Sequence, residues 1–106
     1  MAVVISMVLP GIDLDQYREV HRRVSEAVPQ GLLIHTAGAT EDGLRVVDVW
    51  ESSEAFDRFQ ASRLAEAIAD SPMADAPPAV ERWELGNVWT PSPDALAARD
   101  NFGVAT

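Results

Sequence analysis

The sequence predicts an α+β fold, built as one domain of β-α-β-β-α-β order. Three observations favour it: strand-like and helix-like runs follow one another in that order, the two central strand-like runs meet at an Asp-Gly turn, and 106 residues suffice for one core but not for two. Two crossovers around a central hairpin give a four-stranded antiparallel sheet with both helices on one face.

The first strand is expected at residues 2–9, because this run is almost entirely apolar and rich in β-branched residues. Such a run is typical of a strand that is covered on both faces. It ends at Pro10-Gly11, a pair that favours a turn. No Lys or Arg precedes the run and no small-residue cleavage site follows it, so we interpret it as a strand rather than a signal peptide.

The first helix is expected from Asp13 to about Val28, before Pro29. Asp13 has the spacing of an N-cap residue with Gln16 at position N3. Apolar residues then recur at helical spacing, at Leu14, Tyr17, Val20, Val24 and Val28.

Two further strands, at residues 32–39 and 44–51, flank the turn at residues 40–43. A hairpin loop of this length pairs Ala39 with Leu44, and the same register pairs His35 with Asp48.

The second helix is expected from Ser52 or Ser53, as the cap, to about Asp70. Its apolar stripe consists of Ala55, Phe56, Phe59, Leu64, Ala67 and Ile68. A Pro- and Ala-rich loop at 71–78 then leads to a last strand at 79–89, for which we expect an irregularity. The domain is thus predicted at 1–89. It is followed by a tail at 90–106 with two alternatives: it forms a short helix that packs on a partner subunit, or it frays.

The composition excludes several classes of function. Seventeen acidic residues face eight arginines and no lysine, and the net charge of −9 disfavours nucleic acid and anionic membranes as partners. Without lysine, Schiff-base chemistry and a P-loop are excluded. Without cysteine, so are disulfides and Cys-ligated metals, which fits a cytoplasmic protein. No apolar run approaches the roughly 20 residues of a membrane span.

Apolar residues on both faces of the third strand predict a homodimer. Val46 and Trp50 belong to one face, whereas Val47 and Val49 belong to the other. Because both helices cover the same face, the opposite face of a monomer would expose an apolar patch. Pairing of two subunits through their sheets covers it.

The segment Trp-Glu-Ser-Ser-Glu-Ala-Phe at residues 50–56 resembles the junction of the third strand and second helix in dimeric α/β-barrel proteins, including the antibiotic-biosynthesis-monooxygenase-like group. Together with His35-Thr36-Ala37-Gly38 and the run from Asp42 to Ser52, it is similar to small uncharacterised actinobacterial members. The resemblance implies a ferredoxin-like fold that dimerises through its sheets. The superfamily includes cofactor-free monooxygenases, haem-degrading enzymes, isomerases and members without known chemistry.

The chain departs from this pattern on the second helix. Where monooxygenase-like members often carry a histidine, and haem-degrading members a tryptophan, this chain has Phe59. Ala69 stands where the haem-ligating histidine would be. We therefore expect no haem. A metal site is also not expected, since neither His21 nor His35 has a second ligand at a suitable spacing, and we predict no cofactor.

His35 and Asp48 are the candidate catalytic residues. A carboxylate beside an imidazole fixes its tautomer and prepares it as a base or proton shuttle. The alternative is that Asp48 only satisfies the hydrogen bonding of a partly buried histidine.

The candidate substrate-binding residues are Trp50, Phe59, Gln60, Arg63 and Trp83. Gln60 and Arg63 are polar positions inside an apolar stripe, where they would orient a polar substrate group. Alternatively, Arg63 extends its head to solvent along an apolar stem. Trp50 and Trp83 would wall a pocket for a flat ligand, or fill the core or dimer interface.

Three functions remain open at this point. The first is a cofactor-independent monooxygenase or isomerase acting on an aromatic or polyketide-like substrate, with His35 and Asp48 as the base. The second is a non-catalytic dimer that binds a small hydrophobic or aromatic ligand, which the missing histidine at Phe59 favours. The third is a structural homodimer with a filled interior.

Overall fold

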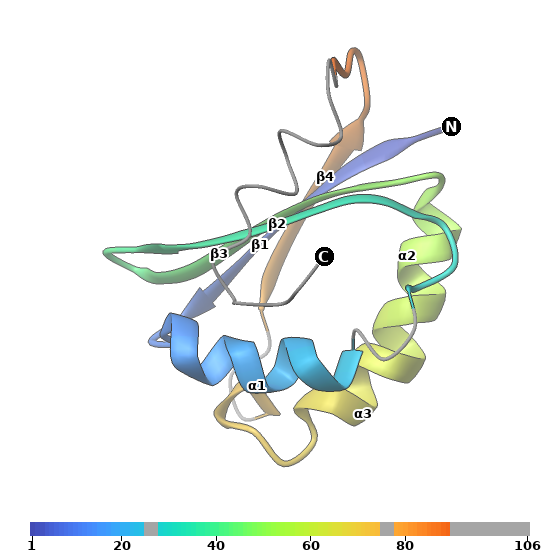
Figure 1. Cartoon of the computed structure of the whole chain (residues 1–106). Coiled ribbons are helices and arrows are strands. Elements are labelled where there is room, and N and C mark those ends of the chain that lie inside the picture. Colours follow the sequence, from blue (N-terminus) through green and yellow to red (C-terminus); the bar gives the residue numbers. More distant parts are fainter. Residues whose placement is uncertain (25–27, 75–77, 90–106) are drawn as a thin grey trace.

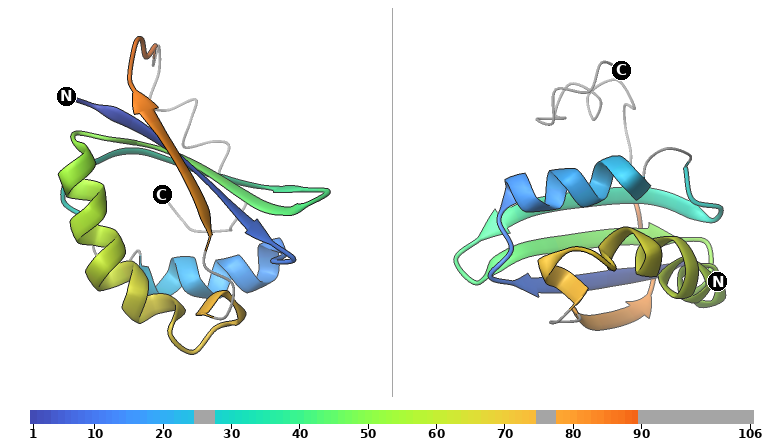
Figure 2. Two further views of the ribbon diagram at one scale, coloured as in Figure 1. Left: turned by 180° about the vertical axis from the view of Figure 1, so that it is seen from behind. Right: turned by 90° about the horizontal axis from the view of Figure 1, so that it is seen from below.

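A computed structural model shows a four-stranded antiparallel sheet with its helices on one face (Figures 1 and 2). The structure describes residues 1–24, 28–74 and 78–89. The strand order is β2-β3-β1-β4, as expected for this fold. The elements are β1 (Val3–Pro10), α1 (Leu14–Val24), β2 (Leu32–Thr40), β3 (Gly43–Trp50), α2 (Ser53–Phe59), the π-helix η1 (Gln60–Leu64), α3 (Ala65–Ile68), the 3₁₀ turn η2 (Pro72–Ala74) and β4 (Ala79–Glu84).

The hairpin of β2 and β3 has the register that the sequence predicts. Ala39 pairs with Leu44, and His35 pairs with Asp48. Gly43, the first residue of β3, has a φ of 132°, a backbone conformation that residues with a side chain rarely adopt. A Cβ at this position would lie 2.8 Å from the nitrogen of Gly11 and closer still to a carbonyl oxygen of β1. The turn chemistry therefore fixes which side chains of β2 and β3 lie opposite each other.

The second predicted helix is present but is not uniform. The Ser52 hydroxyl caps it by accepting a hydrogen bond of 3.1 Å from the backbone N–H of Ala55. The ribbon then continues from α2 through η1 into α3, so one turn of π-helix separates two α-helical parts (Figure 1). Such a turn shifts the side chains that follow it around the helix axis.

One strand irregularity and two element boundaries differ from the sequence-based expectations. The irregularity lies in β2, between Leu32 and Ile34, and not in β4, whose pairing with β1 is regular. β4 ends at Glu84 rather than at residue 89. α1 ends at Val24, and Val28 is not helical. The predicted helix in the tail at 90–106 lies outside the described residues.

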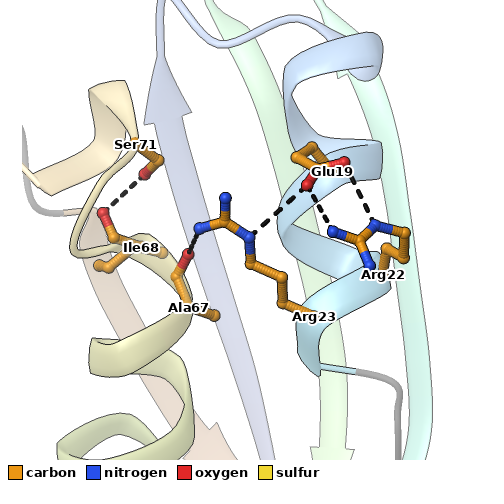
Figure 3. A network of polar contacts seen from close by, with 6 residues as sticks. All are labelled: Glu19, Arg22, Arg23, Ala67, Ile68 and Ser71. Atoms are coloured by element: carbon orange, nitrogen blue, oxygen red, sulfur yellow. Dashed lines mark hydrogen bonds and ion pairs between the residues drawn. The ribbon is translucent and has the colours of Figure 1, made fainter.

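The core lies between the sheet and the helices. Its most deeply buried large side chains are Ile5, Leu44, Val46, Trp50 and Phe56. Arg23 links α1 to α3, because it donates a hydrogen bond of 3.2 Å to the carbonyl oxygen of Ala67 in α3 (Figure 3). Within α1, its guanidinium lies 3.6 Å from the Glu19 carboxylate. No helix among the described residues is long and apolar enough to cross a membrane.

Candidate functional site

A cavity of about 200 Å³ lies between the helix-facing side of the sheet and the helices. The described residues that line it are Met7, Leu9, Tyr17, Val20, His21, Val24, Val28, Pro29, Leu32, His35, Val46, Asp48, Trp50, Phe59, Leu64, Ile68, Met73 and Pro78. Most of these side chains are apolar. The interior is therefore not completely filled, which disfavours the third alternative, a structural homodimer with a filled interior.

A chain of hydrogen bonds joins three side chains of the cavity wall. The Asp48 Oδ1 atom lies 2.7 Å from His35 Nδ1, and His35 Nε2 lies 2.8 Å from the Tyr17 hydroxyl. The second carboxylate oxygen of Asp48 accepts a hydrogen bond of 3.3 Å from the Trp50 indole N–H. β3 supplies Asp48 and Trp50, β2 supplies His35, and α1 supplies Tyr17, so the chain runs from the sheet to the helix layer.

The partners of His35 determine its tautomer. The Asp48 carboxylate accepts the hydrogen bond from His35, which places the ring proton on Nδ1. Burial, with a smaller contribution from the charge of Asp48, raises the pKa of the Tyr17 phenol well above its usual range. Tyr17 is therefore a neutral donor, and Nε2 of His35 accepts its hydrogen bond.

Aromatic rings surround this chain. The His21 ring stacks on that of His35, with centroids 5.4 Å apart and an interplanar angle of 15°. Phe59 packs against Trp50 at a centroid distance of 5.1 Å. Both Trp50 and Phe59 line the cavity, as their assignment as candidate substrate-binding residues requires. No three His, Asp or Glu side chains within the described ranges are grouped as metal ligands.

Three of the expected pocket residues are not part of the cavity wall. Trp83 pairs with Val4 of β1 and so lies on the sheet face opposite the helices, where it is 49% exposed. The Arg63 guanidinium donates a hydrogen bond to the carbonyl oxygen of Val24, at the end of α1. Gln60 is half-buried but does not line the cavity. These three side chains therefore do not line the cavity with His35 and Asp48, and Trp83 lies on the face of the predicted dimer interface, which was the alternative for this residue.

Two residues of the site were missed. The sequence pattern places Tyr17 only in an apolar stripe, and His21 is considered there only as a metal ligand, which its spacing does not favour. Both lie in the cavity wall, four residues apart on one face of α1. The signal in the sequence was the four-residue spacing of a phenol and an imidazole on the apolar face of the predicted helix. Two polar rings on that face indicate that it meets more than a purely apolar core.

Comparisons with known proteins identify the fold. No protein-family model matches the chain, and no curated protein does either. The Streptomyces coelicolor monooxygenase ActVA-Orf6, solved with nanaomycin D, is 23% identical with a TM-score of 0.51, covering 86% of this chain and 92% of that one. SnoaB, a cofactor-independent oxygenase from Streptomyces nogalater, is 18% identical with a TM-score of 0.50, covering 84% and 94%.

A dimeric ferredoxin-like protein of unknown function from Thermobifida fusca is 18% identical with a TM-score of 0.55, covering 79% of this chain and 90% of that one. These neighbours have the antibiotic-biosynthesis-monooxygenase-like fold that the sequence resembles. The predicted α+β, ferredoxin-like fold is thereby confirmed.

Proposed function

We propose that this chain binds a small aromatic or polyketide-like molecule and catalyses its cofactor-independent oxygenation or isomerisation. The observation that carries the proposal is the Asp48–His35–Tyr17 chain in the wall of a mostly apolar cavity. A base, a fixed tautomer and an apolar surrounding are what removal of a proton from such a substrate requires.

The proton moves toward His35. A substrate hydroxyl next to Tyr17 gives its proton to the Tyr17 oxygen. At the same time, the Tyr17 proton passes to His35 Nε2 along the existing hydrogen bond of 2.8 Å. The imidazolium that forms is stabilised by the Asp48 carboxylate at Nδ1. Because the two transfers are concerted, Tyr17 does not become a free phenolate, which agrees with its raised pKa.

Oxygenation then needs only the substrate and O2. The phenolate transfers an electron to O2, and recombination of the two radicals forms a bond between oxygen and the ring carbon para to the phenolate oxygen. Cleavage of the O–O bond with loss of water leaves a second carbonyl group. One phenol and one O2 thus give one quinone and one water, and the electrons lost by the ring are those gained by O2. An isomerase would instead return the proton taken from the hydroxyl oxygen to a carbon of the resulting enolate, which gives the keto tautomer.

Two of the neighbouring folds support this proposal. ActVA-Orf6 is described as a monooxygenase and SnoaB as a cofactor-independent oxygenase. Phe59 favours the second candidate, non-catalytic binding, because an apolar ring lines the cavity where related enzymes often carry a histidine. In that case a ligand would bind in the cavity and be released without chemical change.

The test compares wild-type protein with His35→Ala and with Thr36→Val as a matched control on the opposite face of β2. O2 uptake and exchange of ligand C–H with deuterium from solvent are followed for hydroxylated aromatic compounds of one to three rings. We expect His35→Ala to lower turnover by about 10²- to 10⁴-fold, the usual contribution of a general base, and Thr36→Val to retain it. If wild type and His35→Ala are equally inactive in both assays, catalysis is refuted and ligand binding remains.

A further inference from the structure

We infer that the cavity takes a neutral aromatic hydroxyl compound of one or two rings, such as a naphthol, with its hydroxyl group directed at Tyr17 and His35. This inference rests on the proposed function for the choice of site. It adds the size, the charge and the orientation of the ligand.

The volume of the cavity sets the size. A cavity of about 150 Å³ holds benzene, and pockets for drug-sized ligands begin at about 300 Å³. The cavity of about 200 Å³ lies between these values. Its walls are packed side chains of the sheet and of the helical elements α1, α2, η1, α3 and η2, so a third or fourth fused ring held inside the cavity would have to displace core residues.

The charge of the wall sets the charge of the ligand. Asp48 is the only Asp, Glu or Arg among the described lining residues, and it is 3% exposed. The two arginines nearest to the helix junction are directed elsewhere: Arg63 donates to the carbonyl oxygen of Val24, and Arg23 to that of Ala67. A carboxylate on the ligand would therefore be buried near Asp48 without a guanidinium to pair with, which is unfavourable.

The distribution of polar groups sets the orientation. Tyr17, His21 and His35 form one group beside Asp48, in which the His35 ring stacks on the other two rings and the Tyr17 and His21 rings are tilted against each other. Val28 also lines the cavity and is 79% exposed, so the cavity meets solvent there. A ligand hydroxyl gains hydrogen bonds only at the polar group, whereas the ring system gains from the apolar walls.

Binding is measured by calorimetry on the wild-type protein with 2-naphthol, naphthalene, 2-naphthoate and a hydroxylated tetracyclic quinone. We expect 2-naphthol to bind about threefold to tenfold more tightly than naphthalene, as one hydrogen bond allows. We expect no binding of 2-naphthoate or of the tetracyclic compound. Equal or tighter binding of either of these two compounds would overturn the inference.

Three variants locate the bound ligand. Ile68→Trp places an indole into the cavity, whereas its neighbour Ala69→Trp stands on the exposed side of the helix and serves as the control. We expect the first to weaken 2-naphthol binding at least tenfold and the second to leave it unchanged. In the double variant Tyr17→Phe/His35→Leu, which removes both groups that can bond the ligand hydroxyl, the preference for 2-naphthol over naphthalene should disappear while naphthalene binding is retained. Unchanged 2-naphthol affinity in both Ile68→Trp and the double variant would contradict the inference.

The two proposals fail in different ways. Binding of 2-naphthol in the cavity without turnover of any compound supports the inference and refutes the proposed catalysis. Turnover of compounds with three or more rings, with no binding of 2-naphthol, overturns the inference and leaves the proposed function intact.

Discussion

At the scale of single residues, the burial of Asp48 is the feature that requires compensation. Its side chain is 4% exposed, and a carboxylate in such surroundings is unfavourable unless its oxygens accept hydrogen bonds. The Nδ1–H group of His35 and the indole N–H group of Trp50 supply one bond to each oxygen. Trp50 lies on the same strand as Asp48, and His35 lies on β2. Both hydrogen bonds to Asp48 are therefore in place once β2 and β3 have paired.

Asp48→Asn should reverse the tautomer of His35. The amide keeps one carbonyl oxygen for the Trp50 N–H group and presents its NH2 group to His35 Nδ1, which then has to accept. The proton moves to Nε2, and the stability of the fold decreases by about 1–3 kcal/mol, because a charge-assisted hydrogen bond is lost. Nitrogen chemical shifts of the ring and urea unfolding measure the two effects.

Asp57→Asn is the control for that variant. Asp57 forms an exposed ion pair of 3.0 Å with Arg82, and such pairs contribute about 0–1 kcal/mol. A His35 ring that stays protonated at Nδ1 in Asp48→Asn would contradict the assignment of Asp48 as the residue that fixes the tautomer.

Tyr17 should make the fold sensitive to alkaline pH. Its folded-state pKa is raised above the ordinary value of 10.0, so above that pH the folded state binds more protons than the unfolded state. The free energy of unfolding therefore decreases as the pH rises through and beyond 10. The chain has one tyrosine and no lysine, which makes the titration easy to assign.

Urea unfolding at a series of alkaline pH values, together with the absorbance of the tyrosinate ion, tests this expectation. Tyr17→Phe should lose most of the dependence on pH in this range. A phenol that titrates at its ordinary pKa in the folded protein would show that Tyr17 is not buried as described.

The residue-level site was partly predictable. Register alone places His35 opposite Asp48, because the hairpin loop fixes which residues pair. Tyr17 was not assigned to the site, since its contact with His35 depends on how α1 rotates over the sheet. Helical spacing tells which residues share a face of α1, but it does not tell which strand residue that face meets.

At the scale of elements, Gly43 fixes the hairpin. Gly43→Ala should reduce the free energy of unfolding by about 1–3 kcal/mol, because a Cβ is strained at the φ of 132° and collides with the backbone of β1. Gly38→Ala is the matched control in the same hairpin, since a Cβ there meets nothing within 4 Å. Urea unfolding of both variants is the measurement, and equal stability of the two would contradict this role.

The second helix was predictable in its position but not in its internal regularity. Its cap, its extent and its stripe were predictable from Ser52 onward, but the π-helical turn at Gln60–Leu64 was not. That turn places Arg63 against the end of α1, where a cation is favourable because the last carbonyl groups carry partial negative charge. Regular helical spacing had instead directed Arg63 toward the pocket.

At the scale of the whole molecule, the sheet face opposite the helices is the predicted dimer interface. By strand register this face carries Val4, Val8, Ile34, Val47, Val49 and Trp83. We expect the wild-type chain to sediment as a dimer, because pairing covers these apolar side chains.

Val49→Arg should shift the chain to a monomer, because a charge at the centre of an apolar interface is desolvated without a partner. Ala61→Arg is the control, as it adds the same charge at an exposed position of the helix layer. Sedimentation velocity of the three proteins is the measurement. A wild-type monomer, or a Val49→Arg dimer of unchanged strength, would show that this face is not the interface.

A crystal structure of the protein with 2-naphthol would show whether the cavity beside Asp48, His35 and Tyr17 is the ligand site. We expect density for the two rings between β3 and the helices, with the hydroxyl oxygen within hydrogen-bond distance of the Tyr17 hydroxyl or His35 Nε2. Density for the ligand elsewhere, or side chains filling the cavity, would contradict it.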